Sequence, residues 1–567
     1  MARRSTYLIL LTLVSGAAFA QSPGAAPKFE AADVHLSPPT TIPAVRGPFF
    51  GDTRYEVRYA SMVDLIRVAY GIDPDRIVGG PNWLELDRFD VIAITPAHST
   101  PESRKLMLQA LLADRFGLVI RNDSKNMAAY ALTAGNTPKL QETDGTGETH
   151  CDFKRESAPP PPGPPPGPGS TSDGPQAVIQ VPVLSYTCHN TTMAAFAAAL
   201  PSMPGANQYF DNKPVVDQTA LKGSYDFALR YTPKIPAGVT ASGENMPVFD
   251  GLDKQLGLKL ELSTIPMPVI VVDSANEKPT ANPPDVSKIL PPVPTEFDAA
   301  EVKPSAPAPP GRGGGIAEIK NGRVIVPGIT LENLIVVAWD INQNDLIGAP
   351  KWLNSDRFDV IAKAPDGVAL GDLTPTNSRS IPINIDALRP MLQTLLIQRF
   401  KLAVHTEDRP KSVYTLVAVK PKLQKADPAG RTKWTEGPAA DGKDPRNSNP
   451  VLGRLVTCHN MTMAQFAHLL PEIAPGYIHD EVVDGTGLEG NWDFTFNFSG
   501  AGQLQGGGRS GDGPSSGPGG ADAAPDPTGA LSLLDALPKQ LGLKLEMQKQ
   551  PKPVLVIDHV EQKPSDN

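Results

Sequence analysis

The chain is one module written twice. Three segments of the first half return in the second half in the same order: residues 79–93 as 348–362, residues 187–190 as 457–460, and residues 254–261 as 539–546. Their spacing indicates a duplicated unit of roughly 250 residues, which is within the size of a single domain. Such a unit is too long for a solenoid, whose repeats run about 20–50 residues. The chain is therefore expected to fold as two copies of one domain.

The N-terminal residues are typical of an export signal. Arg3 and Arg4 precede an apolar run at 7–14, and residues 18–20 form an Ala-Phe-Ala cleavage site. The apolar run is shorter than the about 20 residues that a membrane-spanning helix needs, and no similar run follows. We expect a signal peptide at 1–20 and a periplasmic or secreted protein without a transmembrane segment in its mature chain.

Segments rich in proline and glycine divide the chain, which contains 61 Pro and 50 Gly. They have no apolar side chains to bury, so they are expected to be disordered or extended linkers. The expected organisation is repeat 1 at 29–282, with subdomains at 29–145 and 177–282 around a Pro-rich linker at 146–176, then an inter-repeat linker at 283–296, then repeat 2 at 297–567, with subdomains at 297–427 and 451–567 and a Gly-rich disordered loop at 499–529.

The apolar periodicity favours an α+β fold. Apolar residues at 62, 65, 66, 69 and 70 predict an amphipathic helix that begins after Ser61, and the same pattern follows Thr330. A third helix of each repeat is predicted to end at Pro201 or Pro471, and a fourth at Gly257. Short strands are predicted at 118–120, 130–132, 258–262 and 268–272. We expect two small α+β subdomains per repeat, with mixed or antiparallel sheets.

The charge balance argues against a nucleic-acid partner. The chain has 52 Lys and Arg against 61 Asp and Glu, a formal net charge of −9. An acidic chain without a basic stripe lacks the positive surface that binds a phosphate backbone.

The three cysteines are divided unequally between the repeats. Cys188 and Cys458 are equivalent, whereas Trp434 falls at the position of Cys151. Because disulfides persist in exported proteins, we expect a Cys151–Cys188 bridge and an unpaired Cys458. The alternative is three buried free thiols.

The Cys-His pairs at 188–189 and 458–459 suggest a nucleophile or a metal site, but their geometry disfavours both. Neighbouring side chains on a strand point to opposite faces, and zinc sites usually show C-x₂-C or H-x₃-H spacing, which is missing here. We expect a structural role, with no catalytic residue, no metal and no cofactor.

Four aspartates are the alternative candidates. Asp217 and Asp226, with their counterparts Asp484 and Asp493, would form an acidic site if each pair were about 5–10 Å apart in a cleft, as in glycosidases. Aspartates beside Gly and Thr also cap turns. In addition, Arg88 and Asp90 lie two apart on a predicted strand, which favours cross-strand ion pairing over ligand binding.

Several motifs resemble a family of exported proteins of unknown function that is abundant in soil bacteria. The motifs are Gly-x-Pro-x-Trp with Arg-Phe-Asp-Val-x-Ala (79–93, 348–362), Met-Leu-Gln-x-Leu-Leu with Arg-Phe (107–116, 391–400), Val-Val-Asp with Asp-Phe (215–227, 482–494) and Gln-Leu-Gly-Leu-Lys-Leu-Glu. The resemblance covers most of the chain, twice. It implies export and an α+β domain, and fusion of the domain to membrane metallopeptidase-type sensors in some members implies sensing or binding.

These observations predict an exported, non-catalytic binding or interaction protein, involved in sensing or scaffolding at the cell envelope. Its partner is expected to be an envelope or extracellular protein or polymer, for which duplication favours avidity. The alternative is a secreted hydrolase that uses the paired aspartates in a cleft between subdomains.

Overall fold

The computed structural model describes residues 26–51, 53–135, 137–156, 179–210, 213–234, 241–242, 245–306, 318–371, 383–427, 430–437, 444, 446, 452–504 and 529–565. The expected signal peptide, residues 157–176 of the predicted Pro-rich linker and residues 505–528 of the predicted Gly-rich loop lie outside these residues. The predicted linker begins too early, because residues 150–156 form a strand of the second subdomain.

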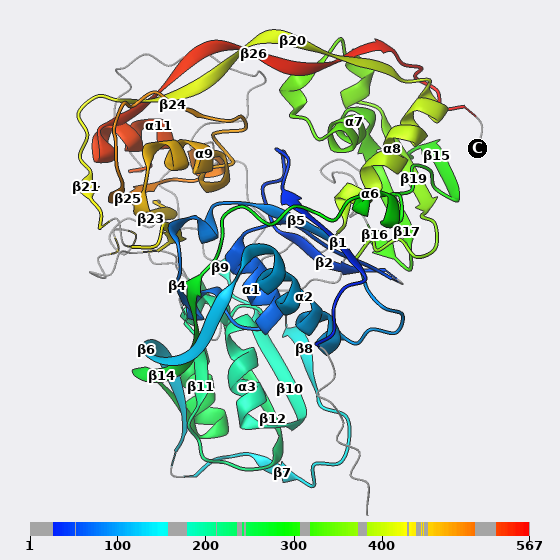
Figure 1. The fold of residues 1–567 in the computed structure, drawn as a ribbon. Coiled ribbons are helices and arrows are strands. Elements are labelled where there is room, and N and C mark those ends of the chain that lie inside the picture. Colours follow the sequence, from blue (N-terminus) through cyan, green and yellow to red (C-terminus); the bar gives the residue numbers. More distant parts are fainter. Residues whose placement is uncertain are drawn as a thin grey trace, which may run out of the picture.

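The protein is an α+β fold in two repeats of the same topology (Figure 1). The first subdomain of each repeat is a four-stranded antiparallel sheet that packs on two helices. In repeat 1 the strand order is β1-β5-β3-β2 (Ala31–Leu36, Phe89–Ile94, Arg54–Ala60, Arg46–Phe50), with α1 (Met62–Tyr70) and α2 (Pro101–Phe116). In repeat 2 it is β15-β19-β17-β16 (Ala299–Pro304, Arg357–Lys363, Arg323–Thr330, Glu318–Lys320), with α7 (Leu331–Trp339) and α8 (Ile385–Phe400).

The second subdomain of each repeat is another four-stranded antiparallel sheet. Its order in repeat 1 is β7-β12-β10-β8 (Gln141–Thr143, Ser224–Tyr231, Val183–Thr191, His150–Glu156), and in repeat 2 it is β21-β25-β23-β22 (Gln424–Lys425, Trp492–Phe498, Arg454–Met461, Lys433–Glu436). Helices α3 (Met193–Ala199) and α9 (Met463–Ile473) pack on these sheets. Each uses one phenylalanine: Phe196 contacts Phe227, and Phe466 contacts Phe494. Shorter helices complete the fold: α4 (Asn207–Phe210), α5 (Val248–Gly251), α6 (Val286–Ile289), α10 (Ala501–Leu504) and α11 (Leu533–Ala536).

A two-stranded antiparallel ribbon joins the two subdomains of each repeat. Strands β6 (Val119–Ala134) and β14 (Leu258–Ser274) form ribbon 1, and β20 (Ala403–Ala418) and β26 (Leu543–His559) form ribbon 2. Ribbon 1 continues the pairing into both subdomains, because β14 pairs with β4 (Ile77–Gly79) and β6 pairs with β11 (Val215–Asp217). In repeat 2 the same places are taken by β18 (Leu346–Ile347) and β24 (Val483–Asp484).

The ribbons differ from the short strands predicted from the sequence. Residues 119–120 and 130–132 of the predicted strands are parts of the single strand β6, and 258–262 and 268–272 are parts of β14. Residues 121–126, which the sequence pattern treated as a break, are exposed on both faces of the ribbon. They show no apolar alternation because neither face is buried there.

The predicted helix ends are confirmed at most positions. Ser61 caps α1 by accepting from the backbone N–H of Asp64, and Thr330 caps α7 by accepting from that of Asn333. Gly257 ends the fourth helical segment with a φ of 66°, which glycine adopts without cost. Pro471 was wrongly predicted to end its helix: α9 continues to Ile473, because proline removes only one backbone hydrogen bond in its last turn.

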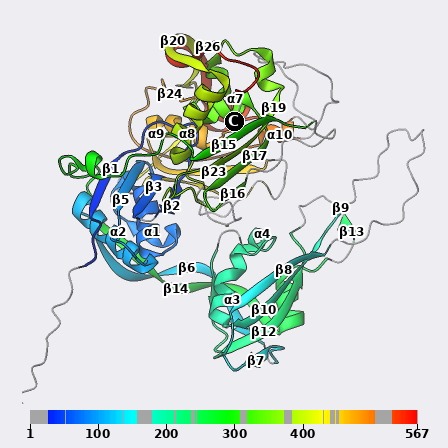
Figure 2. The same cartoon turned by 90° about the vertical axis from the view of Figure 1, so that its right-hand side faces the viewer.

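The first subdomain of repeat 1 lies between the two subdomains of repeat 2 (Figure 1). Arg46 Nε is 2.6 Å from Asp386 Oδ2, and Asn384 Nδ2 donates to Glu56 Oε2 at 3.2 Å. The second subdomain of repeat 1 extends away from repeat 2 in both ribbon views (Figure 2). The repeats therefore share one interface and are not two separately tethered modules.

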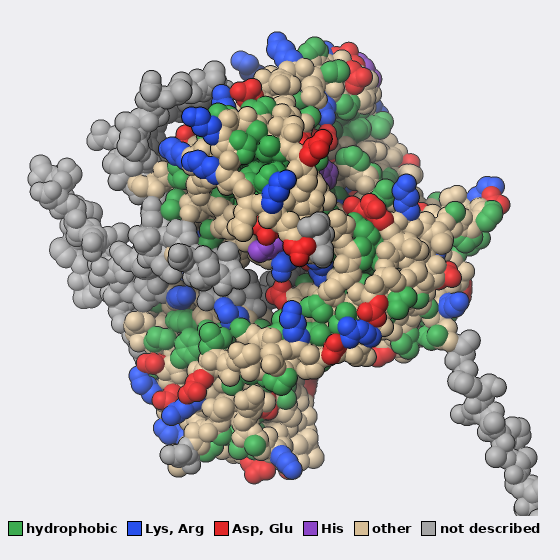
Figure 3. Space-filling view, turned by 60° about the vertical axis from the view of Figure 1, so that its left-hand side comes forward, with side chains coloured by type: hydrophobic (Ala, Val, Ile, Leu, Met, Phe, Trp, Pro, Cys, Tyr) green, Lys and Arg blue, Asp and Glu red, His purple; other side chains and the backbone are tan. Residues whose placement is uncertain are grey.

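The surface charge and the character of the helices complete the description of the fold. Acidic and basic side chains are interspersed over the face drawn in Figure 3, in keeping with the mixed charge of the sequence. Within the described segments, no helix combines the length and the apolar character needed to cross a membrane.

Candidate metal-binding site

Asp217 and Asp484 each organise a turn. Asp217 Oδ1 accepts from the backbone N–H and the hydroxyl of Thr219, at 2.9 and 2.7 Å. Asp484 Oδ1 accepts in the same way from Thr486, at 2.8 Å for both donors. The duplicated contact is the turn-capping arrangement that the sequence offered as the alternative to a catalytic pair.

Asp226 and Asp493 have a different partner, a bulge in the neighbouring strand. Asp226 accepts from the backbone N–H of Asn190 at 2.8 Å, and Asp493 accepts from that of Asn460 at 2.7 Å. The N–H of Asn190 and the ring of His189 lower the pKa of Asp226. Asp226 is therefore ionised at neutral pH, whereas the acid of a glycosidase pair needs a raised pKa.

The acidic residues of each repeat also belong to different sheets. Asp217 ends β11, which pairs with ribbon 1, whereas Asp226 lies on β12 of the second subdomain's sheet. The geometry therefore gives each aspartate a separate local partner.

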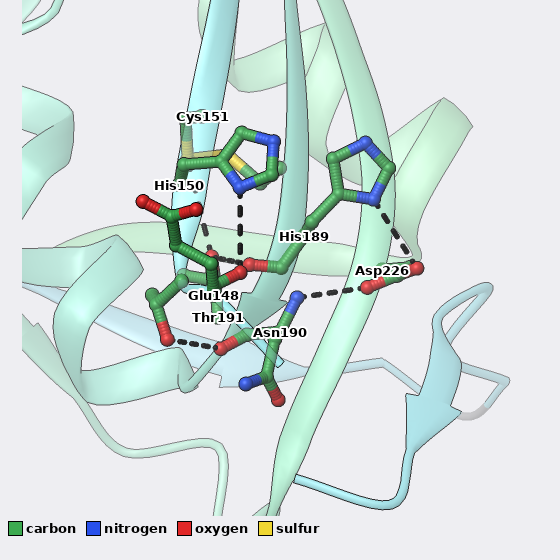
Figure 4. The surroundings of a disulfide bond; sticks show 9 residues. Glu148, His150, Cys151, His189, Asn190, Thr191 and Asp226 are labelled. Carbon is green, nitrogen blue, oxygen red and sulfur yellow. Dashed lines mark hydrogen bonds and ion pairs between the residues drawn. A yellow bond between two sulfur atoms is a disulfide. The ribbon is translucent and has the colours of Figure 1, made fainter. Parts of the chain in front are cut away.

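Cys151 and Cys188 are joined by a disulfide bond (Figure 4). They are directly opposite each other in the pairing of β8 with β10. In repeat 2 Trp434 takes the place of Cys151 and lies opposite Cys458, which is a buried free thiol. Burial raises the pKa of the Cys458 thiol far above its ordinary value, so at neutral pH it carries little of the thiolate that a nucleophile needs.

The strand register that aligns the two cysteines also aligns two histidines. His150 precedes Cys151, His189 follows Cys188, and the two are partners across β8 and β10. Their ring centroids are 5.0 Å apart, and Figure 4 shows the rings side by side. Because side chains alternate along a strand, Cys188 is buried while the side chain of His189 is 42% exposed.

Asp152 completes a cluster of three potential metal ligands. It lies two residues after His150 on β8, so both side chains are on the same face of the sheet. One ligand atom from each of His150, Asp152 and His189 lies within 4.8 Å of the other two. Two imidazoles and one carboxylate suit late divalent transition metals such as Zn²⁺, Cu²⁺ or Ni²⁺.

Hydrogen bonds orient both imidazole rings. His189 Nδ1 is 3.3 Å from Asp226 Oδ2, and His150 Nδ1 is 3.3 Å from the carbonyl oxygen of Glu148. An acceptor at Nδ1 holds the proton there and leaves Nε2 as the available ligand atom, which is how metal-binding histidines are usually oriented. Asp226 thus supports the cluster as an outer carboxylate and is not a ligand of it.

A bulge brings Asp226 into this position. The register of β10 with β12 shifts between Cys188 and Thr191, and Asn190 has a left-handed φ of 47°. The same shift occurs in β23, where Asn460 has a φ of 49°. Asparagine tolerates this conformation better than most residues, so the bulge is a feature of both repeats.

The second repeat keeps only part of the cluster. Lys433 is opposite His459, where His150 is opposite His189, and Thr435 takes the place of Asp152. His459 Nδ1 is 3.9 Å from Asp493 Oδ1, so the outer pair is retained at a longer distance. One histidine and a threonine do not form a three-ligand site, and the cluster is therefore specific to repeat 1.

The spacing of residues along the chain did not predict this cluster. The ligands come from two strands and meet through cross-strand register, so no H-x₃-H or C-x₂-C pattern marks them. The usable signal was the expected disulfide: once Cys151 pairs with Cys188, antiparallel pairing places His150 against His189. Asp90 forms the predicted cross-strand ion pair, with Arg58 on the neighbouring strand β3, whereas Arg88 pairs with Glu472 of the other repeat.

One family matches the chain. It is described as "Protein of unknown function (DUF3738)" and matches residues 63–275 and 332–560. No curated protein and no solved structure matches the chain. The two matched regions cover most of both repeats, so the chain belongs to the DUF3738 family and carries its domain in two copies.

Proposed function

We propose that this is an exported, non-catalytic binding protein whose first repeat binds a late divalent transition metal through His150, Asp152 and His189. The observation that carries the proposal is the meeting of these three side chains on one sheet face, with Asp226 behind His189. A carboxylate behind a metal-binding histidine fixes the ring and makes it a stronger ligand.

The exposure of the cluster favours binding over catalysis. His150 and Asp152 are exposed and His189 is partly exposed. A catalytic metal needs a shaped cavity that excludes water around the reacting atoms, whereas a carrier or sensor site needs access for the ion. The ionised Asp226 and the separate partners of the other aspartates give no support to the alternative hydrolase.

Export is supported by the sequence and by the bond beside the site. Residues 1–20 have the pattern of a signal peptide, and disulfides such as Cys151–Cys188 persist in oxidising compartments outside the cytoplasm. We propose a periplasmic or secreted protein. Envelope-associated sensing or scaffolding is the role that suits one metal site on a subdomain extending from a larger body.

Repeat 2 is proposed to be a scaffold and not a second metal site. Lys433 brings a positive charge to the place of His150 and opposes a cation there. Repeat 2 instead holds the first subdomain of repeat 1 through contacts such as Arg46–Asp386. Duplication thus provides one metal site and one support, which replaces the avidity expected from the sequence.

Zinc titration of the purified protein, prepared without a polyhistidine tag, tests the proposal. Isothermal titration calorimetry should show one bound Zn²⁺ per chain, and Zn²⁺ at 100 times its dissociation constant should stabilise the fold by about 2.7 kcal/mol. His150→Ala and His189→Ala should abolish binding, while His459→Ala, the matched change in repeat 2, should leave it intact. Absence of binding, or equal losses in all three variants, would refute the site.

A further inference from the structure

We infer that the Cys151–Cys188 disulfide is a redox control on the metal site, so that reduction of the bond releases the metal. The inference rests on the proposed function. Cys151 lies between the ligands His150 and Asp152, and Cys188 immediately precedes the ligand His189. All three ligands are therefore chain neighbours of the two bridged residues.

The strand that carries two of the ligands is weakly held. Among the described residues, strand β8 is at the edge of its sheet and pairs only with β10. Residues 150–155 are exposed, so little apolar burial fixes this strand. Edge strands with exposed residues open at low cost in free energy. The disulfide is the covalent link that keeps His150 and Asp152 at their distance from His189.

Repeat 2 shows how the same edge strand is held when ligands and disulfide are both missing. There Trp434 packs against the apolar core in place of the cysteine. Arg431, just before β22, donates to the carbonyl oxygen of Ile77 at 2.7 Å and binds Glu85, both in the first subdomain of repeat 1. The edge strand of repeat 2 is thus fixed by packing and docking. Repeat 1 has a bond that can be broken, and only repeat 1 has the ligand cluster.

Reduction needs a two-electron donor, and an external dithiol supplies it by thiol–disulfide exchange. One of its thiolates attacks Sγ of Cys151, because Cys151 is the exposed residue of the pair and Cys188 is buried. The S–S bond breaks and Cys188 leaves as a thiolate that takes up a proton. The second thiol of the reductant then displaces Cys151 from the mixed disulfide. Two electrons and two protons pass to the protein, the dithiol becomes a disulfide, and the metal keeps its oxidation state.

The two thiols formed by reduction cannot serve as new metal ligands. Cys151 points to the opposite face of β8 from His150 and Asp152, and Cys188 is buried beneath the sheet. Neither sulfur reaches the face on which the metal would bind while the strands stay paired. Reduction should therefore weaken metal binding and not strengthen it.

Zinc affinity should be compared between the oxidised protein, the protein reduced with a phosphine, and Cys151→Ser/Cys188→Ser. We expect affinity to fall by about tenfold or more in the last two samples, as it does when outer support of a metal site is lost. Circular dichroism would report the fold of each sample. Cys458→Ser is the matched control and should behave like the oxidised protein, because its thiol is buried away from the site.

A second variant covers the case in which the double serine variant unfolds. Cys151→Trp recreates the Trp434–Cys458 pair of repeat 2, which holds that edge strand without a bond. A folded Cys151→Trp protein whose zinc affinity no longer changes on reduction would support the inference, because tryptophan then holds the strand in place of the bond. Equal affinity in oxidised and reduced parent protein, or tighter binding after reduction, would overturn it. Failure of the oxidised protein to bind zinc would instead remove the proposed function itself.

Discussion

Arg88 of repeat 1 donates to Glu472 of repeat 2, with Nη2 3.2 Å from Oε2. This contact is one of those by which the first subdomain of repeat 1 docks on the second subdomain of repeat 2. The equivalent positions of the two repeats cannot form the same ion pair. Arg357 corresponds to Arg88, but Ser202, which has no charge, corresponds to Glu472. The interface is therefore made once in the molecule, and the second subdomain of repeat 1 is left to extend from the body.

Arg88→Ala should destabilise the protein by about 1–3 kcal/mol, because it leaves the partly buried carboxylate of Glu472 without this partner. Burial raises the pKa of Glu472 above its ordinary value, and Arg88 opposes that shift. Arg357→Ala is the matched control: Arg357 is exposed, and its loss should cost less than about 0.5 kcal/mol. Urea denaturation of the two variants measures the difference, and equal costs would argue against the docking contact.

Glu56 should make the protein sensitive to acid. Burial alone would raise its pKa, but Arg58 and Arg54 outweigh burial and lower the pKa below the ordinary 4.5. A lowered pKa stabilises the fold above the unfolded-state value, and this stabilisation is lost as the pH falls through the folded-state value. Glu56→Gln should therefore be less stable than the parent protein at pH 7.

The difference in stability between Glu56→Gln and the parent protein should narrow as the pH falls from about 5 towards 3. Over this range the parent protein loses the stabilisation by the ionised carboxylate, which the variant lacks at every pH. Thermal unfolding at a series of pH values measures it. Glu489→Gln, at an exposed position, should follow the parent protein throughout. A constant difference between Glu56→Gln and the parent protein at every pH would contradict the role given to this carboxylate.

Thiol counts should distinguish the three cysteines. The folded protein should show no reactive thiol, because Cys151 and Cys188 are bonded and burial suppresses the thiolate of Cys458. Denaturation without a reductant should expose one thiol, and denaturation after reduction should expose three. Titration with an aromatic disulfide reagent measures all three states. Three thiols before reduction would exclude the bridge.

Sequence patterns within a single element predicted most of the helix ends correctly, whereas strands that depend on pairing with distant residues could not be predicted in full. Ser61 and Thr330 could be identified as caps because the cap and its helix are adjacent in sequence. Residues 121–126 could not be assigned to a strand, because their order comes from pairing with β14 and not from burial. Apolar periodicity reveals a strand only when one of its faces is buried, and both faces of ribbon 1 are exposed at these residues.

The site was predicted only to the extent that a covalent bond revealed the register. Cys151 and Cys188 were predicted to pair because repeat 2 has Trp434 in place of a counterpart of Cys151, and that pairing places His150 opposite His189. Asp226 was singled out for a carboxylate pair, but its partner is an imidazole reached through a bulge at Asn190. A bulge changes which residues face each other by one position, and nothing in the local sequence marks it.

The partial cluster in repeat 2 can be converted into a second zinc site. His459 and Asp493 already correspond to His189 and Asp226, so the second site lacks only the two ligands on β22. Lys433→His with Thr435→Asp should raise zinc binding from one ion to two per chain. Calorimetry gives the number of sites. Lys433→Ala, which removes the charge without adding a ligand, should stay at one.

The second site should be the weaker of the two, because His459 Nδ1 is 3.9 Å from Asp493 while the corresponding distance in repeat 1 is 3.3 Å. A looser outer carboxylate orients its ring less firmly. The new edge strand is nevertheless held by Trp434 and by Arg431, so the added site should keep its zinc when the protein is reduced. A second site that lost its ion on reduction together with the first would show that the disulfide acts on the whole protein and not on β8.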